Sequence, residues 1–151
     1  MIKNLSPEEI DALLTEQQYA HLGCSSQGEI YVVPITYVYE DGNLYSYTQE
    51  GKKTDMMRQQ PKVCVQVEQV RHHKEWSSAI CWGTFEEITA PAEQQRIRLL
   101  LADQFAQGEL SNDEVISPLV EHLHLQKNQE KAPQVIYRIR VDRKTGKAEG
   151  K

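Results

Sequence analysis

The stretch of sequence that decides the fold is VPITYVYEDGNLYSYTQEGKKTD, residues 33–55. Residues 33–37 and 44–48 alternate as β-strands do, and the sequence EDGN between them is typical of a hairpin turn. Gly51-Lys52-Lys53-Thr54-Asp55 then begins a helix over residues 52–60, which ends before a proline. The stretch therefore predicts a β-hairpin whose second strand leads into the N-terminus of a short helix.

Lys52 and Lys53 stand in the first turn of this helix, where the helix dipole disfavours a positive charge by about 0.3–1 kcal/mol. The free backbone N–H groups and the Thr54 hydroxyl at the same end suit an anion, and a bound phosphate would make the two lysines favourable. Solvated surface lysines are the more common case, and the spacing of a P-loop is absent. Both interpretations stay open: exposed lysines or a phosphate site.

The two strands of the hairpin carry hydroxyl side chains among apolar ones, in Thr36 and Tyr37 and in residues 45–48. Pro34 removes a backbone donor from its strand, which indicates a sheet edge or a bulge where backbone groups are free for a ligand. A flat ring bound to these strands, with its phosphate at the following helix, would suit this surface. The alternative is that the tyrosines are ordinary strand residues.

The rest of the chain predicts further strands and helices. Ser6 and Glu9 form a capping box around Pro7 at the start of an N-terminal helix. Further helices are expected over residues 91–105 and from Ser117-Pro118. Six mainly sequential antiparallel strands predict a β-barrel decorated by helices in a single domain of residues 1–151, not an alternating α/β sheet. The six strands are expected at residues 19–25, 30–39, 44–48, 63–70, 77–89 and 135–141.

Composition narrows the classes of function. The 151 residues suffice for one domain, and 17 basic against 22 acidic residues give a net charge of −5, the wrong sign for nucleic acid as the main partner. No run approaches the roughly 20 apolar residues of a membrane helix, and no secretion signal is evident, so we expect a cytoplasmic protein with no membrane partner. Cys24, Cys64 and Cys81 are expected to be buried, reduced thiols.

The order and spacing of these pieces resemble the FMN-binding split barrels related to pyridoxamine 5′-phosphate oxidase, in particular their nitroimidazole-resistance (Nim-like) branch. The resemblance covers most of the chain. It begins with the N-terminal helix and Ala20-His21-Leu22-Gly23 and runs through residues 33–39, 51–53, 60–65, 77–88 and 139–147.

This resemblance implies a six-stranded antiparallel split β-barrel that forms a homodimer, with two FMN molecules at the subunit interface. It implies that Lys53 and Lys52 hold the FMN phosphate, and that Trp82, in the strand at residues 78–84, closes the site from the partner. The other cofactor-binding residues that it implies line the ribityl chain and the isoalloxazine ring: Pro34, Ile35, Thr36, Tyr37, Ser46, Tyr47 and Thr48.

Two departures from the family pattern bear on the activity. Tyr47 stands where the nitroimidazole-reducing branch often carries a histidine beside the flavin. Residues 143–147 also lack the Arg-Leu-x-Pro ending of true pyridoxamine-phosphate oxidases, which argues against vitamin B6 oxidation. With the order of strand, strand and Gly-Lys-Lys helix, the resemblance implies an FMN-dependent oxidoreductase that reduces a small electron-poor acceptor with electrons from NAD(P)H.

The alternative is a flavin-, F420- or haem-binding or sensing protein without turnover, and a third interpretation is a vestigial pocket. The sequence indicates no catalytic residue and no metal site. The pairs His72-His73 and His122-x-His124 do not form a natural two-ligand clamp, so surface histidines are the simpler interpretation, with His122 or His124 as a haem ligand kept as an alternative.

Overall fold

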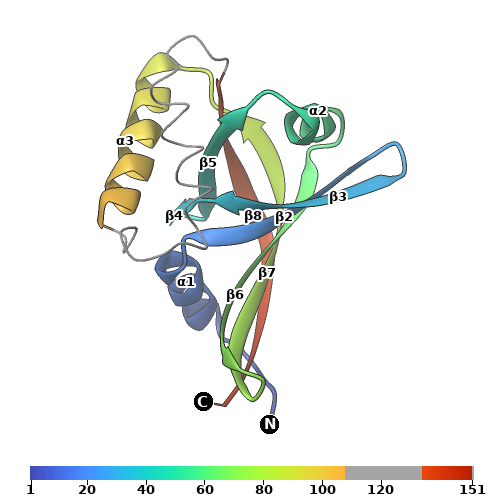
Figure 1. The fold of residues 1–151 in the computed structure, drawn as a ribbon, viewed down its shortest axis with the longest axis vertical. Helices are drawn as coiled ribbons and strands as arrows, with labels where there is room; N and C mark the ends of the chain where they lie inside the picture. Colours follow the sequence, from blue (N-terminus) through green and yellow to red (C-terminus); the bar gives the residue numbers. More distant parts are fainter. Residues whose placement is uncertain (108–133, 151) are drawn as a thin grey trace.

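The computed structural model describes residues 1–107 and 134–150, which form a twisted, mainly antiparallel sheet with three helices against it (Figure 1). The strands lie in the order β3-β2-β6-β7-β8-β5-β4, and β1 pairs with β8. The strands are β1 (Lys3–Asn4), β2 (Tyr19–Ser26), β3 (Glu29–Thr36), β4 (Val38–Glu40), β5 (Asn43–Gln49), β6 (Lys62–His72), β7 (Glu75–Glu87) and β8 (Gln134–Glu149). The helices are α1 (Pro7–Glu16), α2 (Lys52–Gln59) and α3 (Pro91–Gln107).

The split-barrel class is confirmed, but the prediction of six strands is wrong, because the described residues form eight. The strand expected at residues 30–39 divides into β3 and β4, because the backbone N–H of Tyr37 leaves the ladder and donates to the Gln18 carbonyl at 3.1 Å. The short strand β1 is additional, and β8 continues to Glu149, well past the expected end at Val141. The helix expected from Ser117-Pro118 lies outside the described residues.

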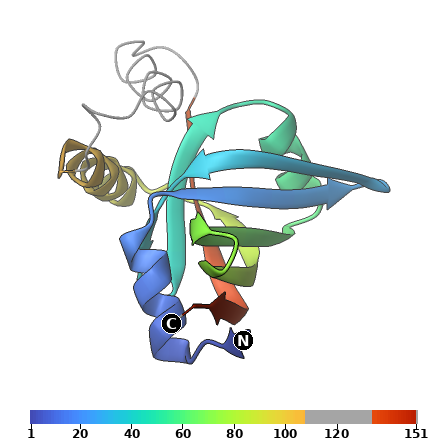
Figure 2. The same cartoon turned by 60° about the horizontal axis from the view of Figure 1, so that its bottom comes forward.

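Two tight turns form the hairpins that the sequence predicts. Gln27 and Gly28 both have positive φ, 53° and 82°, and so do Asp41 and Gly42, 51° and 78°. Two successive positive φ angles match the right-handed twist of the strands that such a turn joins. The β2–β3 hairpin extends away from the rest of the sheet, with β3 at its edge (Figures 1 and 2).

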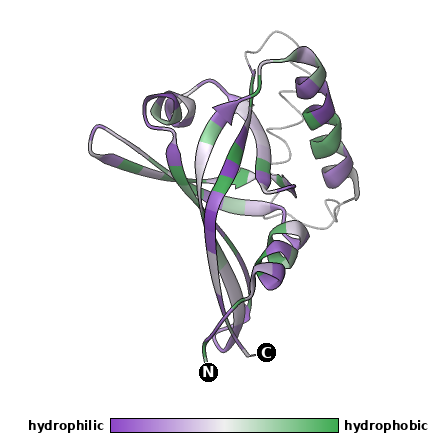
Figure 3. Cartoon of the chain, turned by 180° about the vertical axis from the view of Figure 1, so that it is seen from behind, coloured by the Kyte–Doolittle hydropathy of each residue, from purple (hydrophilic) through white to green (hydrophobic). Residues whose placement is uncertain are grey.

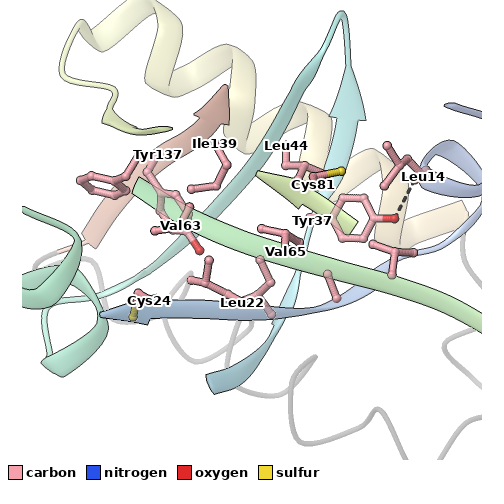
Figure 4. Close-up of a cluster of buried hydrophobic side chains, with 14 of the residues drawn as sticks. Leu14, Leu22, Cys24, Tyr37, Leu44, Val63, Val65, Cys81, Tyr137 and Ile139 are labelled. Carbon is pink, nitrogen blue, oxygen red and sulfur yellow. Dashed lines mark hydrogen bonds between the residues drawn. The ribbon is translucent and has the colours of Figure 1, made fainter. Parts of the chain in front are cut away.

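The main core lies between the sheet and α1. The predicted capping box is present at the start of α1, whose Ile10, Leu13 and Leu14 are buried. In β6 the predicted alternation holds: Val63, Val65 and Val67 face the core and their neighbours point outward. Each buried Val or Leu contributes about 1.5–3 kcal/mol relative to exposure. Figure 4 shows this core, with side chains from β2, β5, β6, β7 and β8 around Tyr37 and Tyr137.

A second apolar cluster lies under α3. Ile97 and Leu101 of α3 pack with Tyr45 of β5 and Ile136 of β8. Hydrophilic and hydrophobic bands alternate along the strands and along α3 (Figure 3). Strand β5 is covered on both faces, because Leu44 faces the main core and Tyr45 faces α3. Among the described helices, none is long and apolar enough to cross a membrane.

Candidate functional site

Helix α2 lies against the β2 strand, toward the turn of the β2–β3 hairpin: Lys52 contacts Glu29, and Gln59 contacts Ser26. In the first turn of α2 the Lys53 side chain is half-buried near the Cys24 thiol, and burial lowers the pKa of the Lys53 amine. Among residues 1–107 and 134–150, Lys53 makes no hydrogen bond and no ion pair. A half-buried cation without a counter-ion costs free energy, so this position favours an anionic ligand.

Lys52 is placed differently. It is exposed, and its Nζ donates to Oε2 of Glu29 at 2.6 Å, which raises the pKa of the Lys52 amine. The same Nζ lies 4.9 Å from the centroid of the Tyr31 ring. The two predicted phosphate-binding lysines are therefore not equivalent, since Lys52 already has a carboxylate partner and Lys53 has none among the described residues.

The backbone of the same corner completes a set of donors. The Gly51 N–H donates to the Thr54 hydroxyl at 3.0 Å, and this hydroxyl donates to the Gly51 carbonyl at 2.9 Å, so the hydroxyl is not free for an anion as the sequence led us to expect. The N–H groups of Lys52 and Lys53 have no acceptor within the helix, as is general for a first helical turn. A Cβ on Gly51 would meet nothing within 4 Å, so the corner is open. Free N–H groups and an unpaired ammonium fit a phosphate monoester.

The predicted residues of β3, and Tyr37 directly after it, lie in different environments. Pro34 is exposed on the edge strand, as its missing N–H requires. Ile35 and Tyr37 belong to the main core, where the Tyr37 hydroxyl donates to the Leu14 carbonyl at 2.7 Å. The side chains of Ile35 and Tyr37 therefore cannot contact a ligand, and only the backbone of these two residues could. Thr36 is buried, and its carbonyl accepts a hydrogen bond of 2.7 Å from the Ser46 hydroxyl.

The predicted residues of β5 divide between the two faces of the strand. Ser46 and Thr48 are buried on the face that carries Leu44. Tyr47 points the other way and packs with the cluster under α3, where it pairs with Ile136 of β8. Burial raises the pKa of the Tyr47 phenol. Tyr47 is therefore not on the same face as Ser46 and Thr48.

Trp82 lies on the outer face of β7, because it is half-buried between Cys81 and Gly83, which are both buried. Within one chain it is thus not brought together with Lys53, which lies beside the inward-facing Cys24. The Arg143 guanidinium stacks on the Trp82 ring at 3.8 Å from its centroid. No local pattern marks Arg143 as a partner of Trp82, since only the pairing of β7 with β8 places the two side by side.

The other side chains considered in the sequence form no comparable site. His72 and His73 lie at the β6–β7 turn with their rings 5.8 Å apart, and His72 Nε2 is 3.5 Å from Glu75. His122 and His124 lie outside the described residues. All three cysteines are free thiols: Cys24 and Cys81 are buried as expected, whereas Cys64 is only half-buried. Burial raises the pKa of Cys81 to about 12, so this thiol stays protonated.

Comparison with known proteins supports the fold and the family. A model of the pyridoxamine 5′-phosphate oxidase family matches residues 6–148. The crystal structure of an FAD-binding protein from Mesorhizobium loti is 26% identical, covers 99% of each chain and has a TM-score of 0.76. A candidate 5-nitroimidazole antibiotic resistance protein from Bacteroides thetaiotaomicron has the same fold, with 22% identity over 98% of this chain and 89% of that one, and a TM-score of 0.69.

A curated sequence relative, an uncharacterised protein of Rhizobium meliloti, is 32% identical over 89 residues. This match spans 59% of the present chain and 59% of the relative, so it covers little more than half the length of either. The family model, in contrast, extends from the cap of α1 to the last residues of β8. The chain belongs to the pyridoxamine 5′-phosphate oxidase family.

Proposed function

We propose that the protein is an FMN-dependent oxidoreductase that takes electrons from NAD(P)H and reduces a small electron-poor acceptor. The observation that carries this proposal is the Lys53 amine, half-buried at the N-terminus of α2 without a counter-ion among the described residues. A phosphate there would accept from Lys53 and from the free N–H groups of the first turn. The FAD-binding structure from Mesorhizobium loti supports a flavin as the ligand.

In this proposal the chain's own residues bind and orient the cofactor. Lys53 holds the phosphate, and Lys52 contributes when it exchanges Glu29 for the ligand. The Ser46–Thr36 hydrogen bond fixes the end of β3 against β5, so that the backbone near Pro34 keeps a fixed position for the ring. The flavin, when bound, supplies the redox chemistry. Free thiols fit a reducing compartment, in agreement with a cytoplasmic protein.

We further propose that a second copy of the chain completes the site. The β2–β3 hairpin exposes two large apolar side chains, Ile30 at 79% and Val32 at 62%, on an edge strand. Exposed apolar side chains on a strand edge favour association. Trp82 faces outward and away from the chain's own Lys53, so it is available to the flavin site of a partner. A homodimer would bury the hairpin and bring the two groups together.

One purification tests the cofactor and the activity in sequence. The protein is incubated with excess FMN, desalted, and examined by absorbance, with the deazaflavin F420 and haem as competing ligands. We expect a yellow protein with bound FMN; a colourless protein with intact fold would disprove the proposal. The FMN form is then mixed anaerobically with NADPH. Bleaching followed by reoxidation with a nitroaromatic or a quinone supports the oxidoreductase, and a flavin that stays oxidised favours a binding or sensing protein.

A further inference from the structure

Trp82 and Arg143 form a stacked pair on the outer face of the sheet. Cζ of Arg143 lies 3.8 Å from the centroid of the Trp82 ring, and the two residues are direct cross-strand partners in β7 and β8. Trp82 is half-buried, whereas Arg143 is exposed. A guanidinium stacked in this way keeps its plane fixed while its N–H donors point to the sides. The pair is thus an ordered donor group on the surface.

Arg143 has no acceptor for those donors among the described residues. All seven arginines of the chain lie in the described part, and Arg143 is the one that makes neither a hydrogen bond nor an ion pair there. The chain has 22 acidic and 17 basic residues, so carboxylates outnumber the cations that could pair with them. The other six have these partners: Arg58 with Glu50 and Glu87, Arg71 with Glu75, Arg96 with Glu40 and Glu93, Arg98 with Gln134, and Arg138 and Arg140 with Glu86.

The row of residues across the strands beside the pair is here called the outer strip and is made of Gly23, Cys64, Trp82 and Arg143. These four residues are successive cross-strand partners in β2, β6, β7 and β8. The Lys62–Asp142 ion pair lies beside this row, with its two charges already paired at 3.6 Å. Gly23 has no side chain, and burial raises the pKa of the Cys64 thiol although Arg143 opposes the shift, so Cys64 is neutral. The outer strip is therefore uncharged except at one end, where the Arg143 guanidinium stands.

We propose that the outer strip binds a planar aromatic carboxylate, with the ring against Trp82 and Cys64 and the carboxylate accepting two N–H groups from Arg143. The guanidinium fork matches a carboxylate in a bidentate arrangement, and charge-assisted pairs of this kind are the strong ones. The ring adds stacking area at the apolar end. The identification of this ligand as the electron acceptor rests on the proposed function above, because Trp82 would then close the flavin site of the partner; binding itself does not depend on it.

Isothermal titration calorimetry with matched probes tests the proposal. 2-Naphthoate and 2-naphthamide have the same ring and differ in charge, and cyclohexanecarboxylate keeps the charge without the aromatic ring. We expect 2-naphthoate to bind more tightly than either of the others. Arg143→Gln is expected to weaken 2-naphthoate binding at least about tenfold, as the loss of a charge-assisted pair would. Arg143→Lys, which keeps the charge and loses the fork, is expected to fall between wild type and Arg143→Gln.

The control is Arg71→Gln, which removes an equal charge from the β6–β7 hairpin and is expected to leave 2-naphthoate binding unchanged. Circular dichroism of each variant shows that the fold is retained. Equal binding of 2-naphthoate and 2-naphthamide, undiminished binding in Arg143→Gln, or no binding of 2-naphthoate to the wild type would each overturn the proposal. Titrations with and without saturating FMN separate the two hypotheses: Arg143-dependent binding by a protein that takes up no flavin supports the outer strip and refutes the proposed function.

Discussion

The phenol of Tyr37 donates a hydrogen bond of 2.7 Å to the backbone carbonyl of Leu14, deep in the main core (Figure 4). Leu14 stands in the last turn of α1, where a carbonyl has no partner within the helix. The bond therefore satisfies a helix end and fastens α1 to the sheet. Burial raises the pKa of this phenol, so the proton that makes the bond is retained across the physiological range.

Replacing Tyr37 and Tyr137 by phenylalanine is expected to have opposite consequences. Both side chains are fully buried. The Tyr137 hydroxyl has only the Ser46 hydroxyl near it among the described residues, in a geometry too poor for a hydrogen bond and with the Ser46 proton already donated to Thr36, and burial raises the pKa of Tyr137 to about 12. Tyr37→Phe leaves the Leu14 carbonyl unsatisfied and is expected to lower the free energy of unfolding by about 1–2 kcal/mol. Tyr137→Phe removes a buried unsatisfied group and is expected to be neutral or stabilising. Urea unfolding measures both, and equal losses would contradict this account.

Lys53→Met is expected to weaken FMN binding and to stabilise the flavin-free protein. The phosphate loses a charge-assisted partner, which corresponds to about 1.5–3 kcal/mol of binding free energy. The flavin-free protein loses a half-buried charge whose pKa burial lowers. Lys52→Met is the matched control with a smaller loss of affinity, because Lys52 is exposed and paired with Glu29. Fluorescence titration and thermal unfolding measure the two effects; an unchanged Kd in Lys53→Met would remove Lys53 from the site.

Asp11→Asn is expected to lower the free energy of unfolding at neutral pH and to have less effect in acid. The Asp11 carboxylate accepts from Lys144 Nζ at 2.5 Å and from the Tyr39 hydroxyl at 2.9 Å, and the Lys144 hydrogen bond is the main cause of its lowered pKa. A lowered pKa stabilises the fold above the ordinary Asp value near 4, and this contribution is lost as the pH falls through the folded-state pKa.

At pH 7 the Asn variant is expected to be less stable than wild type by about 1 kcal/mol, because the Asp11 side chain is 47% exposed and solvent screens the pair. Below about pH 4 the difference is expected to shrink. Urea unfolding of both proteins at pH 7 and pH 3 checks this, and a gap that stays constant with pH would show that the charge of Asp11 does not matter.

Gly83→Ala is expected to destabilise the sheet, and Gly23→Ala is not. A Cβ at Gly83 would lie 2.5 Å from the Arg140 carbonyl oxygen and 2.7 Å from a methyl of Ile139, at the bulge between β7 and β8. Overpacking of this kind costs about 1–3 kcal/mol. At Gly23 the nearest atom would be the Cys64 carbonyl oxygen at 3.6 Å, an ordinary contact. Comparable unfolding midpoints for the two variants would contradict the close approach at Gly83.

The sequence predicts much of the fold because several signals act locally. The capping box at Ser6, the turns at residues 27–28 and 41–42, and the valine alternation in β6 are set by neighbouring residues, and all are found. The second half of β8 is not predicted because Asp142, Lys144, Gly146 and Lys147 are of types that are depleted in strands. Pairing with β7 overrides that preference.

The candidate site was predictable in part for the same reason. The lysine pair at a helix N-terminus can be read locally, but the difference between Lys52 and Lys53 depends on Glu29 and on burial near Cys24, which only the packing of α2 on β2 creates. The opposite directions of Ser46 and Tyr47 follow from strand alternation, whereas the α3 helix over Tyr47 does not. Arg143 needed the register of β7 and β8.

The position of β8 has a consequence for synthesis of the chain. Among the described strands, β4 and β5 pair with the rest of the sheet only through the β5–β8 ladder, and β1 also pairs with β8. A nascent chain that ends before Gln134 can form the part β3-β2-β6-β7 and the β4–β5 hairpin, but it lacks the strand that joins these two parts of the sheet. We therefore expect the two parts of the sheet to come together only after β8 has left the ribosome.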